Sequence, residues 1–318
     1  MNIGIIGPGA IGLLFYFFLS RKVKDLILLD KDKRRALLLR NKGLTVVKNS
    51  KSYKINVNIT AQPQELEDRE LFLICVKSYD TLEVAKTIKS ISRKNKDYFV
   101  LSLQNGLGNL EVLSEILGEE KVLGGVTNMG STLLSPGVIK FAGEGKTIIG
   151  SLKKKTVPVL REIRSVFNSC DIPTSITSDL EGAIWSKLLI NIAINPLTSI
   201  LRVKNGELLN NPHSSLLMQM VLNEAHRITK RKRIKLLYND PQTKLEAVCR
   251  ATSENISSML QDILRGKKTE IDYLNGAIYK LGESLKIPTP LNFIFFKLVK
   301  SLEETSLKRV DSFQDEKL

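Results

Sequence analysis

Residues 2–12 read NIGIIGPGAIG, a short apolar run followed by three glycines in the spacing G-x-G-x-x-G. An apolar helical stretch and a second apolar run, LILLD, which ends at Asp30, follow directly. In this strand–turn–helix–strand order Gly7 permits a tight turn, Gly9 lets the backbone approach a pyrophosphate, and Gly12 lets the helix pack on the strand. Free N–H groups at the start of the helix would bind the phosphates. The residues of this predicted dinucleotide loop are Gly7, Pro8, Gly9, Ala10, Ile11 and Gly12.

Apolar runs and helical stretches continue to alternate beyond this loop. Strands are expected at 2–6, 26–30, 71–77 and 98–106, and helices at 10–19, 80–91 and 108–117. Strands that alternate with helices indicate a parallel sheet, which binds ligands at the carboxyl edge of its strands. Lys77 and Asn105 stand at that edge and are candidate cofactor contacts. The alternatives are a solvated lysine and a turn asparagine.

The second half of the chain has a different pattern. Further elements are expected as strands and turns over 121–150 and as helices at 156–168, 179–202, 213–230, 241–264, 269–285 and 290–304. A chain of 318 residues is long enough for two domains, and Pro173 marks a boundary. We expect an α/β protein with a parallel-sheet domain over 1–175 and an all-helical domain over 176–318. The polar tail 305–318 is expected to fray.

The helix that contains residues 185–196, WSKLLINIAINP, carries three polar residues on an apolar background. Lys187, Asn191 and Asn195 are spaced i, i+4 and i+8, so one ammonium and two carboxamides share one stripe. Burying them costs free energy unless they have partners. They either pair with neighbouring backbone and each other, or face a cleft and bind an oxygen-rich small molecule. Pro196 is expected to end or kink the helix just after Asn195.

Composition bears on nucleic-acid binding, metal binding and membrane insertion. The net charge of +15 fits an anionic ligand or nucleic acid, but also a solvated, lysine-rich surface. The basic run at 229–235 has no interleaved aromatic residue, which favours the solvated surface. Three scattered cysteines and two histidines predict neither disulfides nor a metal site. The apolar run at 10–19 is too short for a membrane span, so a soluble, cytoplasmic protein is expected.

The choice between NAD and NADP depends on the residues that follow the second strand. Asp30 lies 23 residues after Gly7, where a carboxylate would bond a ribose 2′-OH and repel a 2′-phosphate. The four basic residues close behind it could instead hold that phosphate; they are Lys31, Lys33, Arg34 and Arg35. The residues alone leave both cofactors open.

Motifs along nearly the whole chain resemble those of the ketopantoate reductase (2-dehydropantoate 2-reductase) family, in the same order. They are GPGAIG (7–12), ICVKSYDT (74–81), SLQNGLGN (102–109), GVTNMGSTLLSPG (125–137), WSKLLINIAINPLTSI (185–200), KNGEL (204–208), ATSENISSMLQDILRGKKTEIDYLNG (251–276) and IPTP (287–290). The resemblance implies a Rossmann-type N-terminal domain, a helical C-terminal domain and an active site between them. It also implies reduction of ketopantoate to pantoate with NADPH, on the path to pantothenate and coenzyme A.

The resemblance assigns roles by position. Lys187 matches the family's catalytic lysine, the proton donor. Substrate contacts are implied for Asn105, Lys187, Asn191, Asn195, Asn205 and Ser258, and cofactor contacts for Lys31, Lys77, Asn105 and Glu270, the acid near both cofactor and lysine. Lys31 stands where the family commonly has an arginine for the 2′-phosphate. NADPH is therefore expected, and NADH stays open because of Asp30.

Two other functions are compatible with the sequence. One is a reductase of the same two-domain plan that acts on another 2-keto acid or an opine. The other is a basic, non-enzymatic nucleic-acid-binding protein, which would show a steep salt dependence. The expected partner is a small 2-keto acid, with neither nucleic acid nor membrane, and a homodimer is compatible with the sequence.

Overall fold

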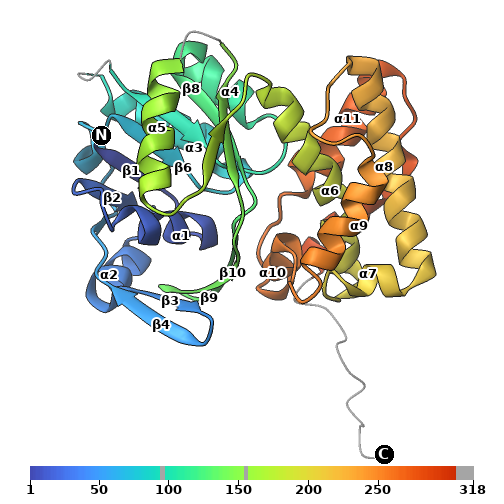
Figure 1. Cartoon of the computed structure of the whole chain (residues 1–318), viewed down its shortest axis with the longest axis horizontal. Coiled ribbons are helices and arrows are strands. Elements are labelled where there is room, and N and C mark those ends of the chain that lie inside the picture. The colour runs from blue at the N-terminus through green and yellow to red at the C-terminus, as the bar shows by residue number, and fades with distance from the viewer. Residues whose placement is uncertain (94–96, 154–156, 306–318) are drawn as a thin grey trace, which may run out of the picture. The chain divides into compact units, whose positions relative to one another are not determined.

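The computed structural model describes residues 1–93, 97–153 and 157–305 (Figure 1). The chain divides into two compact units, Met1–Lys187 and Leu188–Leu318. The first unit contains strands and helices, and the described part of the second contains helices alone, so the expected α/β plan with a helical C-terminal region is confirmed. The limits 1–175 and 176–318 for two domains stay a prediction. The tail expected to fray lies outside the described residues from 306 onward.

An eight-stranded sheet forms the centre of the first unit, in the order β12-β11-β8-β7-β6-β1-β2-β5. Its strands are β1 (Ile3–Ile6), β2 (Leu26–Leu29), β5 (Ile59–Thr60), β6 (Leu71–Ile74), β7 (Phe99–Ser102), β8 (Val122–Thr127), β11 (Thr147–Ser151) and β12 (Thr174–Ile176). The four predicted strands pair in parallel, as expected. The sheet is not parallel throughout, because β11 runs antiparallel to β8, and the connection between them, residues 128–146, contains no helix.

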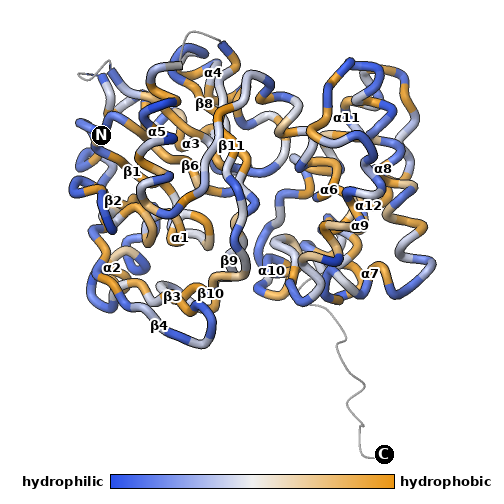
Figure 2. Tube along the Cα trace, viewed as in Figure 1, coloured by the Kyte–Doolittle hydropathy of each residue, from blue (hydrophilic) through white to orange (hydrophobic). Residues whose placement is uncertain are grey.

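Helices cover both faces of this sheet. They are α1 (Ala10–Leu19), α3 (Thr81–Ile91), α4 (Asn109–Leu117) and α5 (Val157–Ser169). Along β6, Leu71 and Leu73 share a buried cluster with α1 and α5, whereas Phe72 and Ile74 share one with α3 and α4. Successive strand residues point to opposite faces, so a strand covered on both sides is apolar throughout. Residues 12–19 of α1 are buried, as expected, and Figure 2 colours this helix orange.

A second sheet of the first unit, ordered β4-β3-β10-β9, packs against α1. Its strands are β3 (Leu44–Lys48), β4 (Lys51–Ile55), β9 (Gly130–Ser135) and β10 (Val138–Gly143). Phe18 of α1 meets Phe141 of β10 edge-on, with ring centroids 5.9 Å apart. The strands expected within 121–150 are therefore present, but two of them belong to this second sheet. Sequence analysis did not predict β3, β4, β5 or α2 (Lys33–Lys42).

Helix α6 (Leu180–Leu201) runs from the first unit into the second. The helices that follow are α7 (Glu207–Asn210), α8 (Pro212–Lys232), α9 (Pro241–Ala251), α10 (Ser258–Leu264), α11 (Asn275–Leu285) and α12 (Pro290–Glu304). The prediction of one helix over 241–264 is wrong, because Ser257 caps a new helix by accepting the N–H of Leu260 at 3.1 Å. The helix expected over 269–285 begins only at Asn275, after a 3₁₀ turn at Ile271–Tyr273.

Within the described residues α6 alone is long and apolar enough, by length and composition, to cross a membrane. Of its most apolar window, 72% is buried inside the structure. Core helices of soluble proteins commonly have this composition and burial.

Candidate active site

The glycine loop between β1 and α1 fits a pyrophosphate. A Cβ at Gly12 would lie 2.0 Å from the oxygen of Gly7, and one at Gly7, where φ is +104°, would lie 2.8 Å from the nitrogen of Val76. Gly9 is different, because a Cβ there would meet only the oxygen of Cys75, at 3.9 Å. Within the described residues α1 has neither a side-chain cap nor an acidic residue in its first turn. Its first N–H groups and the space beside Gly9 therefore suit a bound anion.

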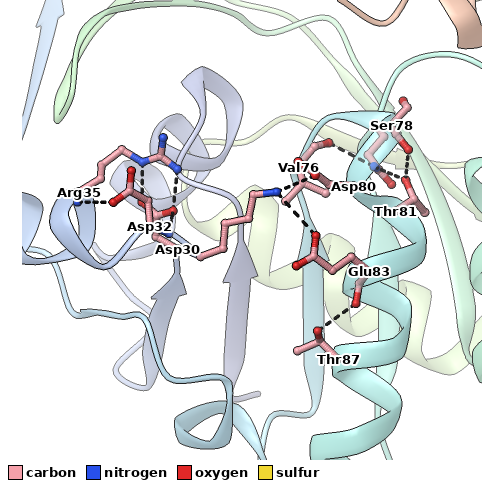
Figure 3. A network of polar contacts seen from close by, with 11 residues as sticks. Asp30, Asp32, Arg35, Val76, Ser78, Asp80, Thr81, Glu83 and Thr87 are labelled. Carbon is pink, nitrogen blue, oxygen red and sulfur yellow. Dashed lines mark hydrogen bonds and ion pairs between the residues drawn. The ribbon is translucent and has the colours of Figure 1, made fainter. Parts of the chain in front are cut away.

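The carboxylate of Asp30, at the end of β2, is fully engaged within the protein. Arg35 donates to it through Nε at 2.5 Å and through Nη2 at 2.6 Å, and the main-chain N–H of Asp32 donates at 3.0 Å. Asp30 is only 1% exposed. Figure 3 shows Arg35 turned back from α2 toward this carboxylate. A bidentate, buried pair of this kind leaves Asp30 little freedom to bond a ribose hydroxyl.

Lys31, the next residue, points toward two carboxylates near the start of α3. Its Nζ lies 2.7 Å from Asp80 Oδ1 and 3.7 Å from Glu83 Oε2. The carboxylates of Asp80 and Glu83, labelled in Figure 3, both contact Lys31. The hydrogen bond that Lys31 donates to Asp80, more than any other contact, raises the pKa of Lys31. Lys31 therefore remains a cation at neutral pH, but one that already has a counter-ion.

A hydrogen-bond network ties the end of β6 to the end of β7, and so brings Lys77 close to Asn105. Ser78, directly after Lys77, donates its hydroxyl to the main-chain oxygen of Asn105 at 2.9 Å. The amide of Asn109 donates to the same oxygen at 2.9 Å and to the Ser78 hydroxyl at 3.1 Å. Gln104 donates to the oxygen of Val76 at 3.1 Å, across the two strand ends. Both predicted cofactor residues thus lie at the carboxyl edge, as their positions in the sequence indicated.

Lys187 is held by the end of β8. Its Nζ donates to the main-chain oxygen of Thr127 at 2.7 Å. The Thr127 hydroxyl in turn contacts that of Thr147 on β11 at 3.0 Å and accepts the N–H of Met129 at 3.2 Å. Thr127 is only 3% exposed, so its carbonyl is a fixed acceptor. One N–H of the ammonium is therefore oriented by a fixed backbone oxygen.

Helix α6 keeps Lys187, Asn191 and Asn195 on one face, as the spacing predicted. Asn191 is half-buried and Asn195 is buried. The helix does not end at Pro196, contrary to one form of the prediction, but continues to Leu201. The asparagines are thus held within a continuous helix and not at a frayed end.

Two loops in the second unit position Asn205 and Ser258. The amide of Asn205 donates to the Thr252 hydroxyl at 2.9 Å, while its buried Oδ1 has no partner within the described residues. Ser258 is the exposed first residue of α10. Its neighbour Ser257 is buried and bonded to Thr198, 2.7 Å away. Ser257 is therefore structural, and the hydroxyl of Ser258 is accessible.

Glu270 lies in the connection between α10 and α11 and is 6% exposed. The residue before it, Thr269, donates its N–H at 2.7 Å and its hydroxyl at 2.6 Å to Glu303 of α12. This anchor fixes the backbone at Glu270. No group of three or more His, Cys, Asp or Glu that could hold a metal occurs among the described residues.

Comparison with known proteins identifies the family. The model of the ketopantoate reductase PanE/ApbA family matches residues 3–154, and the model of its C-terminal domain matches residues 179–303. The chain belongs to the ketopantoate reductase PanE/ApbA family. The resemblance seen in the sequence motifs is therefore confirmed.

Relatives in this family match along almost their whole length. The 2-dehydropantoate 2-reductase of Pyrococcus abyssi is 35% identical over 97% of this chain and 100% of its own. That of Archaeoglobus fulgidus is 36% identical over 95% of this chain and 98% of its own. A solved PanE/ApbA family ketopantoate reductase from Ralstonia eutropha JMP134 has a TM-score of 0.87 and 28% identity, and the match covers 96% of this chain and 100% of that one.

Sequence reasoning missed the roles of three residues that hold candidate site residues of the first unit in place. They are Arg35, Asp80 and Thr127. Arg35 was weighed only as a phosphate ligand, although a carboxylate five residues earlier was a signal for pairing across the start of α2. Asp80 and Thr127 have no such local signal, because their partners are 49 and 60 residues away.

Proposed function

We propose that this chain catalyses the NAD(P)H-dependent reduction of 2-dehydropantoate (ketopantoate) to pantoate, in pantothenate and coenzyme A biosynthesis. The near-full-length likeness to two 2-dehydropantoate 2-reductases, at 35% and 36% identity, carries the proposal. Two features support it. The glycine loop, which leads into a helix with no side-chain cap, suits a dinucleotide, and the face of α6 that carries Lys187, Asn191 and Asn195 suits an oxygen-rich acid. The cytoplasm is the proposed compartment, and a homodimer stays a prediction.

In this reaction Lys187 is the general acid. A nicotinamide cofactor held by the glycine loop would supply the hydride for the 2-keto carbon, and the carbonyl oxygen would then need a proton. The Lys187 ammonium supplies that proton from Nζ. Its hydrogen bond to the oxygen of Thr127 supports this role, because one N–H is committed to the backbone and thereby orients the others. Proton donation by a positioned side chain contributes ~10²–10⁴-fold to a rate.

The remaining site residues bind substrate oxygens. Asn191 and Asn195 present carboxamides on the same helix face as the acid. Asn205 and Asn105 offer further amides, and the accessible hydroxyl of Ser258 is proposed to bind the substrate carboxylate. A hydrogen bond to a charged group contributes about 1.5–3 kcal/mol, so loss of Ser258 should act mainly on KM. Glu270 is proposed to lie near the cofactor and the lysine.

The proposed cofactor is NADPH in preference to NADH. The loop from Gly7 to Gly12 would hold its pyrophosphate, Lys77 and Asn105 would line its cleft, and Lys31 would contact the 2′-phosphate. The bidentate pair with Arg35 supports this preference, since it keeps the carboxylate of Asp30 away from a phosphate.

Oxidation of NADPH and of NADH, measured side by side with ketopantoate, tests the proposal. We expect turnover with ketopantoate, and a higher kcat/KM for NADPH. A panel of other 2-keto acids in the same assay tests the runner-up, a reductase of the same plan with another substrate. Turnover of one of these acids with none of ketopantoate would overturn the proposed substrate, and no oxidation of either cofactor would overturn the function.

A further inference from the structure

The end of β2 carries a cation that is already paired. Lys31 Nζ lies 2.7 Å from Asp80 Oδ1 and 3.7 Å from Glu83 Oε2, although 64% of the lysine side chain is exposed. An exposed lysine normally samples many rotamers, so a short contact to one carboxylate and a second carboxylate nearby restrict it to one region.

The pair crosses the edge of the sheet at which the dinucleotide is expected. Ile6 of β1 is paired with Leu29 of β2 on one side and with Ile74 of β6 on the other. Lys31 follows β2, and Asp80 follows β6. The ion pair between Lys31 and Asp80 therefore lies across the carboxyl end of β1, where the glycine loop begins.

The local structure of Asp80 leaves its carboxylate available to Lys31. Asp80 ends a 3₁₀ turn, Ser78–Asp80, that leads directly into α3, and its own backbone is helical, with φ −95° and ψ −3°. A capping aspartate has a non-helical backbone, so Asp80 is not placed to cap α3. Within the described residues its side chain makes no capping bond, and its carboxylate accepts a hydrogen bond from Lys31 at 2.7 Å.

The other carboxylate at this edge does not compete for Lys31. Asp30 is bonded twice by Arg35 and once by the N–H of Asp32. A 2′-phosphate that binds Lys31 must therefore displace the carboxylates of Asp80 and Glu83 from the ammonium. The phosphate then remains close to both negative charges, which lowers the free energy gained from the contact.

We propose that Asp80, assisted by Glu83, is the residue that limits discrimination between 2′-phosphorylated and unphosphorylated adenine dinucleotides. It acts as an internal counter-ion for Lys31 that the 2′-phosphate must displace. An unphosphorylated ribose needs no such displacement, so Asp80 weakens NADPH selectively. The inference rests on the proposed dinucleotide-dependent function.

Calorimetric titration of the full chain tests this without any catalytic turnover. The probes are adenosine 2′,5′-bisphosphate and adenosine 5′-monophosphate. We expect Asp80→Asn to tighten the bisphosphate by about 1.4- to fivefold, the range of an exposed ion pair, and to leave the monophosphate nearly unchanged. Glu83→Gln is the matched control. It removes the same charge but no 2.7 Å contact, so it should tighten the bisphosphate less.

A double-mutant cycle shows whether Lys31 transmits the effect. In a Lys31→Ala background the gain from Asp80→Asn should fall to about half or less, because only direct repulsion of the phosphate remains. Equal changes for both nucleotides, no gain with the bisphosphate, or an undiminished gain without Lys31 would each overturn the inference while the dinucleotide site stands. A wild type that binds neither nucleotide and oxidises neither cofactor would instead overturn the proposed function together with this inference.

Discussion

The side-chain amide of Asn275 donates a hydrogen bond to the main-chain oxygen of Ile192, at 3.0 Å. In a regular helix that oxygen would accept the N–H four residues later, but position 196 is proline and has none. Asn275 of α11 thus supplies the donor that α6 lacks. This bond accounts for the continuation of α6 through Pro196 to Leu201. A proline that sequence rules treat as a helix end is accommodated by a residue about eighty positions away.

The first prediction concerns this bond. Asn275→Ala should lower the free energy of unfolding by about 1–3 kcal/mol, since two buried acceptors, the oxygen of Ile192 and Oδ1 of Asn292, lose a donor. The cost stays modest because the buried Oδ1 of Asn275 has no hydrogen-bond partner in the described structure. Removing this unpaired oxygen stabilises the folded state and offsets part of the cost. In a Pro196→Ala background, where residue 196 regains its N–H, the same substitution should cost less. Urea denaturation of the four proteins measures this coupling, and an equal cost in both backgrounds would contradict it.

The second prediction separates the two roles of the glycine loop. Gly12→Ala should destabilise the first unit, because its Cβ would lie 2.0 Å from the oxygen of Gly7. Gly9→Ala should leave the melting temperature almost unchanged, because the nearest atom to its Cβ is 3.9 Å away. The new methyl would instead occupy the space meant for the pyrophosphate and weaken dinucleotide binding. Thermal melts and nucleotide titration of both variants check this. A stable Gly9→Ala that binds dinucleotide normally would place the pyrophosphate elsewhere.

Much of the fold was predictable because its main strands are covered on both faces. The runs IGII, LILL and LFLI are apolar at every position, so they can be identified as buried strands without knowledge of the strands they pair with. Strand β4, KSYKI, is exposed along almost its whole length, and its lysines hide the strand pattern. The break in the helix expected over 241–264 depends on the hydroxyl of Ser257 as a cap, a competition that propensity does not resolve.

The candidate site was predictable where it depends on spacing along one element. The glycine loop follows from local sequence, and the stripe that contains Lys187 follows from the helical repeat. The contacts that restrain these residues are long-range. Lys31 meets Asp80 only because β1 lies between β2 and β6, and Lys187 meets Thr127 only because β8 ends beside α6. Such contacts need the strand order, which periodicity does not provide.

The third prediction concerns pH. Burial, reinforced by the charge of Lys230, lowers the pKa of His226 below its usual 6.5, and Asp240 opposes the shift weakly. At a pH between the lowered pKa of His226 in the folded protein and the usual 6.5 of the unfolded chain, His226 binds a proton only in the unfolded chain. The contribution of His226 to stability is therefore complete above pH 6.5 and declines as the pH falls through 6.5 toward the folded pKa.

Substitution isolates this contribution. Wild type should lose more unfolding free energy than His226→Gln between about pH 7.5 and about pH 5.5, because the variant lacks the imidazole that takes up the proton. His213→Gln is the matched control, since it removes an exposed imidazole from the first turn of the same helix, α8. Denaturant titrations at the two pH values measure the difference. Parallel losses in wild type and His226→Gln would contradict the assignment.

The last prediction tests whether Lys187 gives a proton or only a positive charge. Lys187→Ala should fold, because the hydrogen bond it loses to the oxygen of Thr127 is only part-buried, and should lose ~10²–10⁴-fold in kcat. Lys187→Arg keeps the charge and can still donate to that carbonyl, but a guanidinium does not release its proton at working pH. If proton transfer is the role, Lys187→Arg should be almost as slow as the alanine variant while its KM for ketopantoate stays near that of wild type. An arginine variant with nearly normal kcat would reduce Lys187 to electrostatic stabilisation, and the proton would then have to come from water or another residue.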